Sequence, residues 1–442
     1  MDWDETAIQR WLEPLATRPG ELAEVFGESL WELALDWRDG EAREVRIRQE
    51  EGTGARWRFG RDEHFVFVAG SEEASVREAV RALRAAAGRD TLPIRPSRAG
   101  ARAVGERPSY DGDRWSRRLA SAFARHAPRH RFRWRIRETE RRVVAAGRPA
   151  SVARRRLLSL EGRFTAASRM GDEERSFSFH APDADATADE LKASLTAAGE
   201  ARDRAAAAPV GETDVVLAKG SAAVLFHEIL AHPLEADAGP SPLSALPDAR
   251  VTVSELEVHD DPRRLDLFGG YERDDEGSSP RTVRLVHSGQ IGSRLTDRAH
   301  GGAQGSTGHG RRAGPAEPPS PRSSNLVVAA GSATSEEILR RLGNGLWIEE
   351  FRNGSVDLAG GTFRVAFPRA RRVRRGRFAD EVGPGILAGE LLPALRNIEP
   401  VLGRDVQVCR SLGWCARGGQ VLPVQGAAPD VLIRRLAVRP AL

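Results

Sequence analysis

The sequence predicts an α+β protein in three sections: a small N-terminal α/β domain (1–95), a strand-rich middle section (96–208) and a β-rich C-terminal domain (209–442). Two observations carry this prediction. Segments in which apolar and polar residues alternate, as they do in half-buried strands, recur along the chain. Helical patterns are few, and one of them (222–230) is apolar on every side, which is typical of a buried helix. With 442 residues, 40% of them hydrophobic and 29% charged, the chain can form two or three domains.

In the N-terminal domain, residues 1–37 are predicted to be helical, because tryptophans and leucines recur there at helix-like spacing. Three alternating segments follow and predict strands: 44–49, 55–60 and 64–70. Residues 71–86 predict an amphipathic helix with Ser71 as its N-cap.

The middle section holds two long alternating segments (131–147 and 150–168) that predict paired strands, with helices expected near 113–126 and over 183–208. Arginine-rich stretches at 129–155 and 369–377 are candidates for nucleic-acid binding, but neither contains a base-recognition motif. The first is better explained as one polar face of a strand, and the second as a hairpin that turns at Gly376. We therefore expect no nucleic-acid partner.

The C-terminal domain is organised around a short apolar helix that carries His227, Glu228 and His232. A buried strand (214–218) precedes it, and Ser221 occupies the N-cap position. Histidines five residues apart point about 140° away from each other on an ideal helix, too far apart for one ion. The helix therefore contains a π-type bulge, or His232 ends it and turns back; Pro233 favours the second interpretation. Further strands are expected at 251–261, 282–292, 347–351, 355–360 and 362–367.

A third metal ligand would distinguish a metal site from two unrelated core histidines. The chain has two cysteines. Cys409 lies in a strand-like run and is expected to be a small core residue. Cys415 lies in a glycine-flanked turn, where its thiolate could complete a His-His-Cys zinc site with one position open for water, as in catalytic zinc sites.

Four more residues are weaker candidates for supporting this site or contacting substrate. Glu235 and Asp237 could orient the ligand histidines or only stabilise a turn. His309 and Arg311 lie in a glycine- and proline-rich segment (301–325) whose length suggests a lid, although a solvated basic loop is the favoured interpretation.

The sequence resembles the TldD/PmbA metallopeptidases, also called modulators of DNA gyrase. Active members carry His-Glu-x-x-x-His followed by Leu-Glu-x-Asp, matched here by 227–232 and 234–237. The similarity continues through 305–312, 321–325, 353–365 and the Cys-x-x-x-Gly-Gln-x-Leu-Pro pattern at 415–423, and departs from the family at 313–320. PmbA-type paralogues lack the histidine motif, so the chain resembles the TldD-type subunit. The resemblance implies pairing with a PmbA-like paralogue, or a homodimer, and cleavage of unfolded polypeptides or peptide precursors in the cytoplasm.

These observations lead to the hypothesis of a zinc-dependent peptidase. His227, His232 and Cys415 would hold Zn²⁺, which lowers the pKa of water from 15.7 toward about 7, and Glu228 would act as general base. The alternative is a non-catalytic, zinc-stabilised partner subunit of a protease complex. No apolar run reaches the ~18 residues of a membrane span, and two cysteines fit a reducing cytoplasm. An extended peptide is expected to dock on a sheet edge beside the zinc site.

Overall fold

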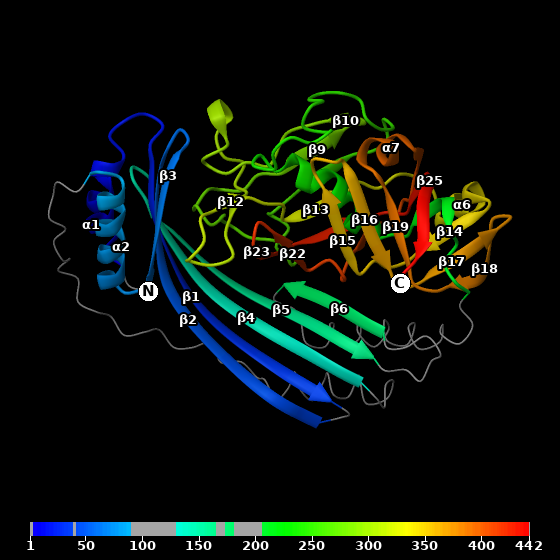
Figure 1. Ribbon diagram of the computed structural model, residues 1–442, viewed down its shortest axis with the longest axis horizontal. Coiled ribbons are helices and arrows are strands. Elements are labelled where there is room, and N and C mark those ends of the chain that lie inside the picture. Colours follow the sequence, from blue (N-terminus) through cyan, green and yellow to red (C-terminus); the bar gives the residue numbers. More distant parts are fainter. Residues whose placement is uncertain (1–2, 39–40, 90–129, 165–172, 181–205, 442) are drawn as a thin grey trace.

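The computed structural model describes residues 3–38, 41–89, 130–164, 173–180 and 206–441. Long curved strands run beneath the C-terminal section, and two helices cover one end of them (Figure 1). The helix predicted near 113–126, and most of the one predicted over 183–208, lie outside the described residues. No helix in the described part of the chain is both long enough and apolar enough to cross a membrane.

Among the described residues, the N-terminal strands form one six-stranded antiparallel sheet in the order β3-β2-β1-β4-β5-β6. Its strands are β1 (Leu22–Arg38), β2 (Glu41–Phe59), β3 (Asp62–Ala69), β4 (His130–Ala145), β5 (Ser151–Phe164) and β6 (Glu173–His180). Because β1 pairs with both β2 and β4, the boundary expected near residue 95 falls between strands of a shared sheet. The predicted pairing of the two long segments is confirmed by the register of β4 against β5.

The prediction that residues 1–37 are helical is wrong beyond the first three turns. Helix α1 spans Glu5–Leu12, a 3₁₀ turn η1 follows at Glu13–Leu15, and β1 occupies Leu22–Arg38. Acidic residues recur every fourth position along β1, a spacing that puts them on one face in a helix and in a strand alike. The members of this acidic row are Glu24, Glu28, Glu32 and Asp36.

Arginines of β4 pair with this acidic row and fix β1 as a strand. Opposite residues on the two strands form ion pairs of 2.8, 3.1 and 2.7 Å: Glu28–Arg141, Glu32–Arg137 and Asp36–Arg133. Arg133, Arg137 and Arg141 thus lie on one polar face of β4, as predicted for the arginine-rich stretch 129–155.

Helix α2 (Glu73–Ala86) confirms the helix predicted over 71–86, but its N-cap is Glu72 rather than Ser71. The Ser71 hydroxyl instead donates to Glu51 at 2.8 Å. Helices α1 and α2 pack their apolar faces, including Ile8, Leu12, Val80 and Leu83, on the end of the sheet.

Within the described residues, the C-terminal section contains two large sheets and two small hairpins. The nine-stranded sheet comprises β7 (Gly211–Leu217), β14 (Gly345–Ile348), β15 (Asn353–Asp357), β16 (Thr362–Phe367), β17 (Ala370–Arg374), β18 (Arg377–Val382), β19 (Gly385–Glu390), β20 (Ile398–Leu402) and β25 (Val431–Pro440). The six-stranded sheet comprises β8 (Val258–Asp260), β9 (Val283–His287), β10 (Gln290–Ile291), β13 (Asn325–Val328), β21 (Gln407–Val408) and β24 (Gln425–Ala428). The hairpins are β11 (Gly310–Arg311) with β12 (Ser320–Pro321) and β22 (Trp414–Arg417) with β23 (Gln420–Pro423).

The remaining helices of this section are short: α5 (Ala222–Phe226), η2 (His227–Ala231), η3 (His232–Leu234), η4 (Gly302–Gln304), α6 (Ser335–Leu342) and α7 (Leu391–Arg396). Each strand predicted in this section overlaps one that is present, but three are shorter than expected: β8 covers only 258–260 of 251–261, β14 only 347–348 of 347–351, and β15 only 355–357 of 355–360. The hairpin predicted at 369–377 is also confirmed, because β17 and β18 join through Arg375 and Gly376 at φ of 50° and 70°.

Helix α5 lies between the two large sheets, against β13 and β24 on one side and β15 on the other. Its apolar residues are all buried in a core shared by both sheets, as the sequence predicts. Gly426 permits the close approach to β24, since a Cβ atom there would lie 2.7 Å from the Cβ of Ala223. The helix that carries the candidate site is therefore held from both sides.

Candidate metal centre

The histidine-bearing segment changes its winding at the site. After α5, residues His227–Ala231 form a π turn in which the His232 N–H donates to the His227 carbonyl five residues earlier. This wider turn brings the two histidines to the same side. His232 keeps helical dihedrals (φ −57°, ψ −47°), so the favoured interpretation, in which it leaves the helix before Pro233, is wrong and the π-bulge alternative is correct.

Ser221 occupies the N-cap position, but its side chain makes no capping hydrogen bond. Its hydroxyl donates to the carbonyls of Ala218 (2.7 Å) and Ile348 (3.1 Å). Ser221 therefore ties the start of the helix to β14 rather than satisfying the first helical N–H groups.

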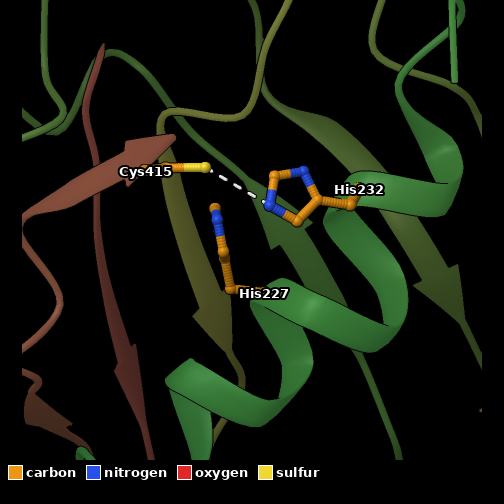
Figure 2. Close-up of side chains that lie close together, drawn as sticks. All are labelled: His227, His232 and Cys415. Carbon is orange, nitrogen blue, oxygen red and sulfur yellow. Dashed lines mark hydrogen bonds between the residues drawn. The ribbon is translucent and has the colours of Figure 1, made fainter. Parts of the chain in front are cut away.

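The structure brings His227, His232 and Cys415 together, as expected from the sequence (Figure 2). Their candidate ligand atoms all lie within 4.8 Å of one another, and the Cys415 Sγ lies 3.3 Å from the His232 Nε2. The residues are 1%, 5% and 7% exposed. Cys415 lies on strand β22 and not in a turn, so the sequence-based placement of this residue is corrected.

This cluster fits a metal ion. Neither ring nitrogen of the buried His227 has a hydrogen-bond partner in the described structure, which is costly for a buried polar group unless something binds it. Tetrahedral zinc with Zn–N of about 2.0–2.1 Å and Zn–S of about 2.3 Å places ligand atoms roughly 3.3–3.6 Å apart, within the spread observed here. Burial alone would raise the pKa of Cys415, but His232 and His227 hold that pKa well below its usual value and favour the thiolate.

Glu235 fixes the orientation of His232. Its carboxylate is fully buried, lies 3.1 Å from the His232 Nδ1 and accepts a 2.9 Å hydrogen bond from the Ser323 N–H. Burial opposes ionisation, but His232, Arg322 and Arg417 lower the pKa of Glu235 to about 2. A carboxylate that holds the outer nitrogen of a histidine leaves the other nitrogen free to bind a metal.

Two arginines that the sequence analysis did not single out join the site to its surroundings. Arg322 lies 3.3 Å from the Cys415 Sγ and also donates to the Cys415 carbonyl. Arg417 pairs with Glu235 at 3.0 Å and with Asp237 at 2.8 Å. Asp237 thus acts through Arg417 and does not contact the histidines. Both arginines lie in segments that carried the family resemblance (321–325 and 415–423), which was the available signal.

Glu228 points toward strand β15. Its side chain is 7% exposed and approaches the backbone of Gly354 so closely that a Cβ atom there would lie 2.4 Å from the Glu228 Oε1. No described residue donates a hydrogen bond to this carboxylate. Burial raises the pKa of Glu228 above its ordinary value, although His227 and His232 oppose the shift.

The expectation of a solvated basic loop at 309–312 is wrong. His309, Arg311 and Arg312 are 0%, 2% and 0% exposed. The His309 Nε2 lies 3.1 Å from the Asp260 Oδ1, and Arg311 donates to the carbonyls of Ser323 and Pro423. Backbone carbonyls accept hydrogen bonds from Arg311, and the Asp260 carboxylate lies beside His309. Composition alone does not reveal these partners.

The fold and this cluster define an α+β protein with a buried candidate metal centre between two sheets. The profile of the PmbA/TldA metallopeptidase C-terminal domain matches residues 210–440, more than half of the chain. The chain belongs to the PmbA/TldD metallopeptidase family.

Relatives and solved structures agree with this assignment. The chain is 28% identical over 236 residues to a metalloprotease TldD homolog from Buchnera aphidicola, covering 52% of this chain and 49% of the relative. It is 30% identical over 239 residues to a metalloprotease from Methanothermobacter thermautotrophicus, covering 53% and 52%. The match thus spans about half the length of these curated relatives. The crystal structure of TldE from Thermococcus kodakarensis shares the fold (TM-score 0.72, 14% identity, 98% of this chain and 99% of that chain).

Proposed function

We propose that this protein is a zinc-dependent peptidase whose metal is held by His227, His232 and Cys415. The observation that carries the proposal is the buried His227, whose two nitrogens lack partners while the Cys415 sulfur and the His232 nitrogen lie beside it. Two histidines and a cysteine form a three-ligand set that leaves a tetrahedral ion one open position.

When bound, zinc supplies a Lewis acid that makes water nucleophilic near neutral pH and polarises a carbonyl. Glu228 accepts the proton of that water at its carboxylate and delivers it to the amine of the departing peptide. Glu235 and Arg322 keep His232 and Cys415 in place during the reaction.

The substrate proposed is an extended, unfolded polypeptide that docks along β15. In the described structure β15 pairs only with β16, so one edge has free backbone groups, and its Gly354 adjoins Glu228. A peptide that adds as a strand to this edge would be held by backbone hydrogen bonds, which do not depend on its side chains. Arg322 brings the 301–325 segment to Cys415, but its buried parts (307–312 and 321–325) are held by hydrogen bonds, so the lid role is proposed for the more exposed residues 301–306.

The test is Glu228→Gln, compared with the matched surface change Glu336→Gln. We expect wild type and Glu336→Gln to bind about one zinc per chain and to cleave disordered peptides. Glu228→Gln should bind zinc equally and lose at least 10²-fold in kcat. Cleavage by Glu228→Gln at the wild-type rate would remove Glu228 as the base, and zinc-free wild-type protein would refute the metal assignment.

From the family alone, we propose that this protein forms a complex with a PmbA-like paralogue or with a second copy of itself. The proposed location of the complex is the cytoplasm. Cleavage assays with and without a co-encoded paralogue test this. Cleavage in neither case, with zinc bound, would favour the alternative of a non-catalytic, zinc-stabilised subunit.

A further inference from the structure

A cavity of about 100 Å³ lies where the long N-terminal sheet meets the C-terminal section. Residues of β4 and β5 line one side, and residues 265–275 together with β11 line the other. One water needs roughly 10–15 Å³ of such space, so the cavity has room for several waters or for a small polyatomic ion. Five arginines contribute to its walls: Arg141, Arg154, Arg155, Arg273 and Arg311.

Three of these arginines have no carboxylate partner among the described residues: Arg155, Arg273 and Arg311. Arg273 is exposed to solvent and donates to the Ser279 hydroxyl. Arg155 donates to the Phe268 carbonyl, and its buried Nε has no hydrogen-bond partner. Arg311 is fully buried and donates only to the backbone carbonyls of Ser323 and Pro423. Because carbonyls are neutral, they do not balance the charge of these guanidinium groups. Among the described residues, counter-charge comes only from carboxylates that Arg155 and Arg311 do not pair with, namely Asp275 for both and Asp260 for Arg311.

Three carboxylates also line the cavity, Glu272, Asp274 and Asp275, so they are outnumbered by the five arginines. Asp275 forms a 2.7 Å ion pair with Arg141, and Asp274 accepts a 2.7 Å hydrogen bond from the Ser278 N–H. Glu272 is exposed to solvent. The cavity therefore keeps an excess of positive charge.

The unbalanced charge is unfavourable in the unliganded protein. Burial, together with the positive charges of Arg311 and Arg141, holds the pKa of Arg155 well below its usual range. Partly desolvated cations without paired counter-charges are costly, and an anion that entered the cavity would relieve that cost.

We propose that this cavity is a binding site for a small oxyanion, either inorganic phosphate or the phosphate group of a larger ligand, held by Arg155 and Arg311. The planar guanidinium fork suits bidentate contact with oxyanions. None of His227, Glu228, His232 and Cys415 lines the cavity, so the site is distinct from the proposed peptidase centre. A bound anion would contact the N-terminal sheet and the C-terminal section at once.

Isothermal titration of the full chain with inorganic phosphate, in a chloride buffer of constant ionic strength, tests the site. The informative variant is Arg155→Met. Its matched control is Arg156→Met, which removes the same charge from the neighbouring position of β5, where the side chain pairs with Glu138 and does not line the cavity. Arg311 is left intact, because it also holds the backbone beside the metal centre.

We expect one saturable phosphate site in wild type and in Arg156→Met, and an affinity at least tenfold weaker in Arg155→Met. Arg155→Met should fold normally, as checked by its melting temperature without phosphate, because it removes an unpaired cation; Arg155→Gln is the second variant. Phosphate also stabilises proteins through surface exclusion, so only the Arg155-dependent part of any Tm rise counts. No saturable binding in wild type, or equal affinity in Arg155→Met, would overturn the proposal.

Glycerol 3-phosphate distinguishes the two sources of the anion. Binding of inorganic phosphate alone would identify a free anion as the ligand. Arg155-dependent binding of both would show that the site accepts a phosphate group on a larger molecule.

Discussion

Replacing Gly354 with alanine tests whether β15 positions the general base. A Cβ atom at this site would lie 2.4 Å from the Glu228 Oε1 and 2.6 Å from its Cγ, whereas ordinary contact begins at 3.4 Å. The Glu228 carboxylate must therefore move by about 1 Å. A misplacement of about 1 Å at a reacting group can cost about 10²-fold in rate.

We expect Gly354→Ala to lower kcat for a disordered peptide by roughly 10- to 100-fold while one zinc per chain is retained, since the alanine does not contact the metal ligands. Stability should change by less than about 1 kcal/mol, because the flexible Glu228 side chain can yield. The assays are peptide cleavage, metal analysis and thermal unfolding. Gly314→Ala is the control, because a Cβ atom there meets nothing within 4 Å.

The double variant Gly354→Ala/Glu228→Gln separates positioning from other effects. If Gly354 acts only through the carboxylate, alanine should change the residual activity of Glu228→Gln by less than about threefold. Full activity in Gly354→Ala, loss of zinc in parallel with activity, or additive losses in the double variant would each refute this reasoning.

Three further changes test other parts of the structure. Cys415→Ser should lower zinc affinity at least tenfold in chelator competition, because a hydroxyl replaces the thiolate ligand; unchanged affinity would remove Cys415 from the ligand set. Glu235→Gln should lower zinc affinity by about 10- to 100-fold by weakening its hold on His232, and an unaltered affinity would count against that role. Glu21 accepts hydrogen bonds from the Thr17 and Arg18 backbone, and despite burial Arg18 and its other partners lower its pKa from 4.5 to about 2. The carboxylate of Glu21 therefore stabilises the fold above pH 4.5, and this stabilisation is lost as the pH falls toward 2. Glu21→Gln should lower the unfolding free energy by about 1–3 kcal/mol at pH 7 and by less at pH 3. An equal loss at both pH values would contradict this assignment.

Much of the C-terminal section could be predicted from the sequence because its signals are local. Two histidines and a glutamate in an otherwise apolar helix need binding partners once they are buried. The chain has only two cysteines that could supply a third metal ligand. The winding of the helix was not predictable, because Pro233 only disfavours the α conformation in the preceding residue and packing between two sheets outweighs that preference.

The N-terminal error has a different physical origin. The helix prediction rested on tryptophans and leucines, but Trp31, Leu33 and Leu35 also recur at the two-residue period of a strand. The carboxylates from Glu24 to Asp36, four residues apart, share a face in a helix and in a strand alike, so they do not distinguish the two. The deciding partners lie on β4, more than 90 residues later in the chain. Partners of Arg311 and His309 are also distant along the chain, 112 residues away for Pro423 and 49 for Asp260, which is why a buried network was mistaken for a solvated loop.

The separation of His232 and Cys415 along the chain, 183 residues, sets an order of events during synthesis. Ribosomes add about 5–20 residues per second, so the histidines emerge roughly 10–40 s before the cysteine. Strand β7 likewise lacks its pairing partners when it emerges, because its neighbours β14 and β25 are both synthesised later. The nascent histidine segment therefore passes through an interval without its third ligand or its completed sheet. If the proposed zinc site forms, all three ligands come together only after β22 is translated, so the ion would complete its coordination late in folding.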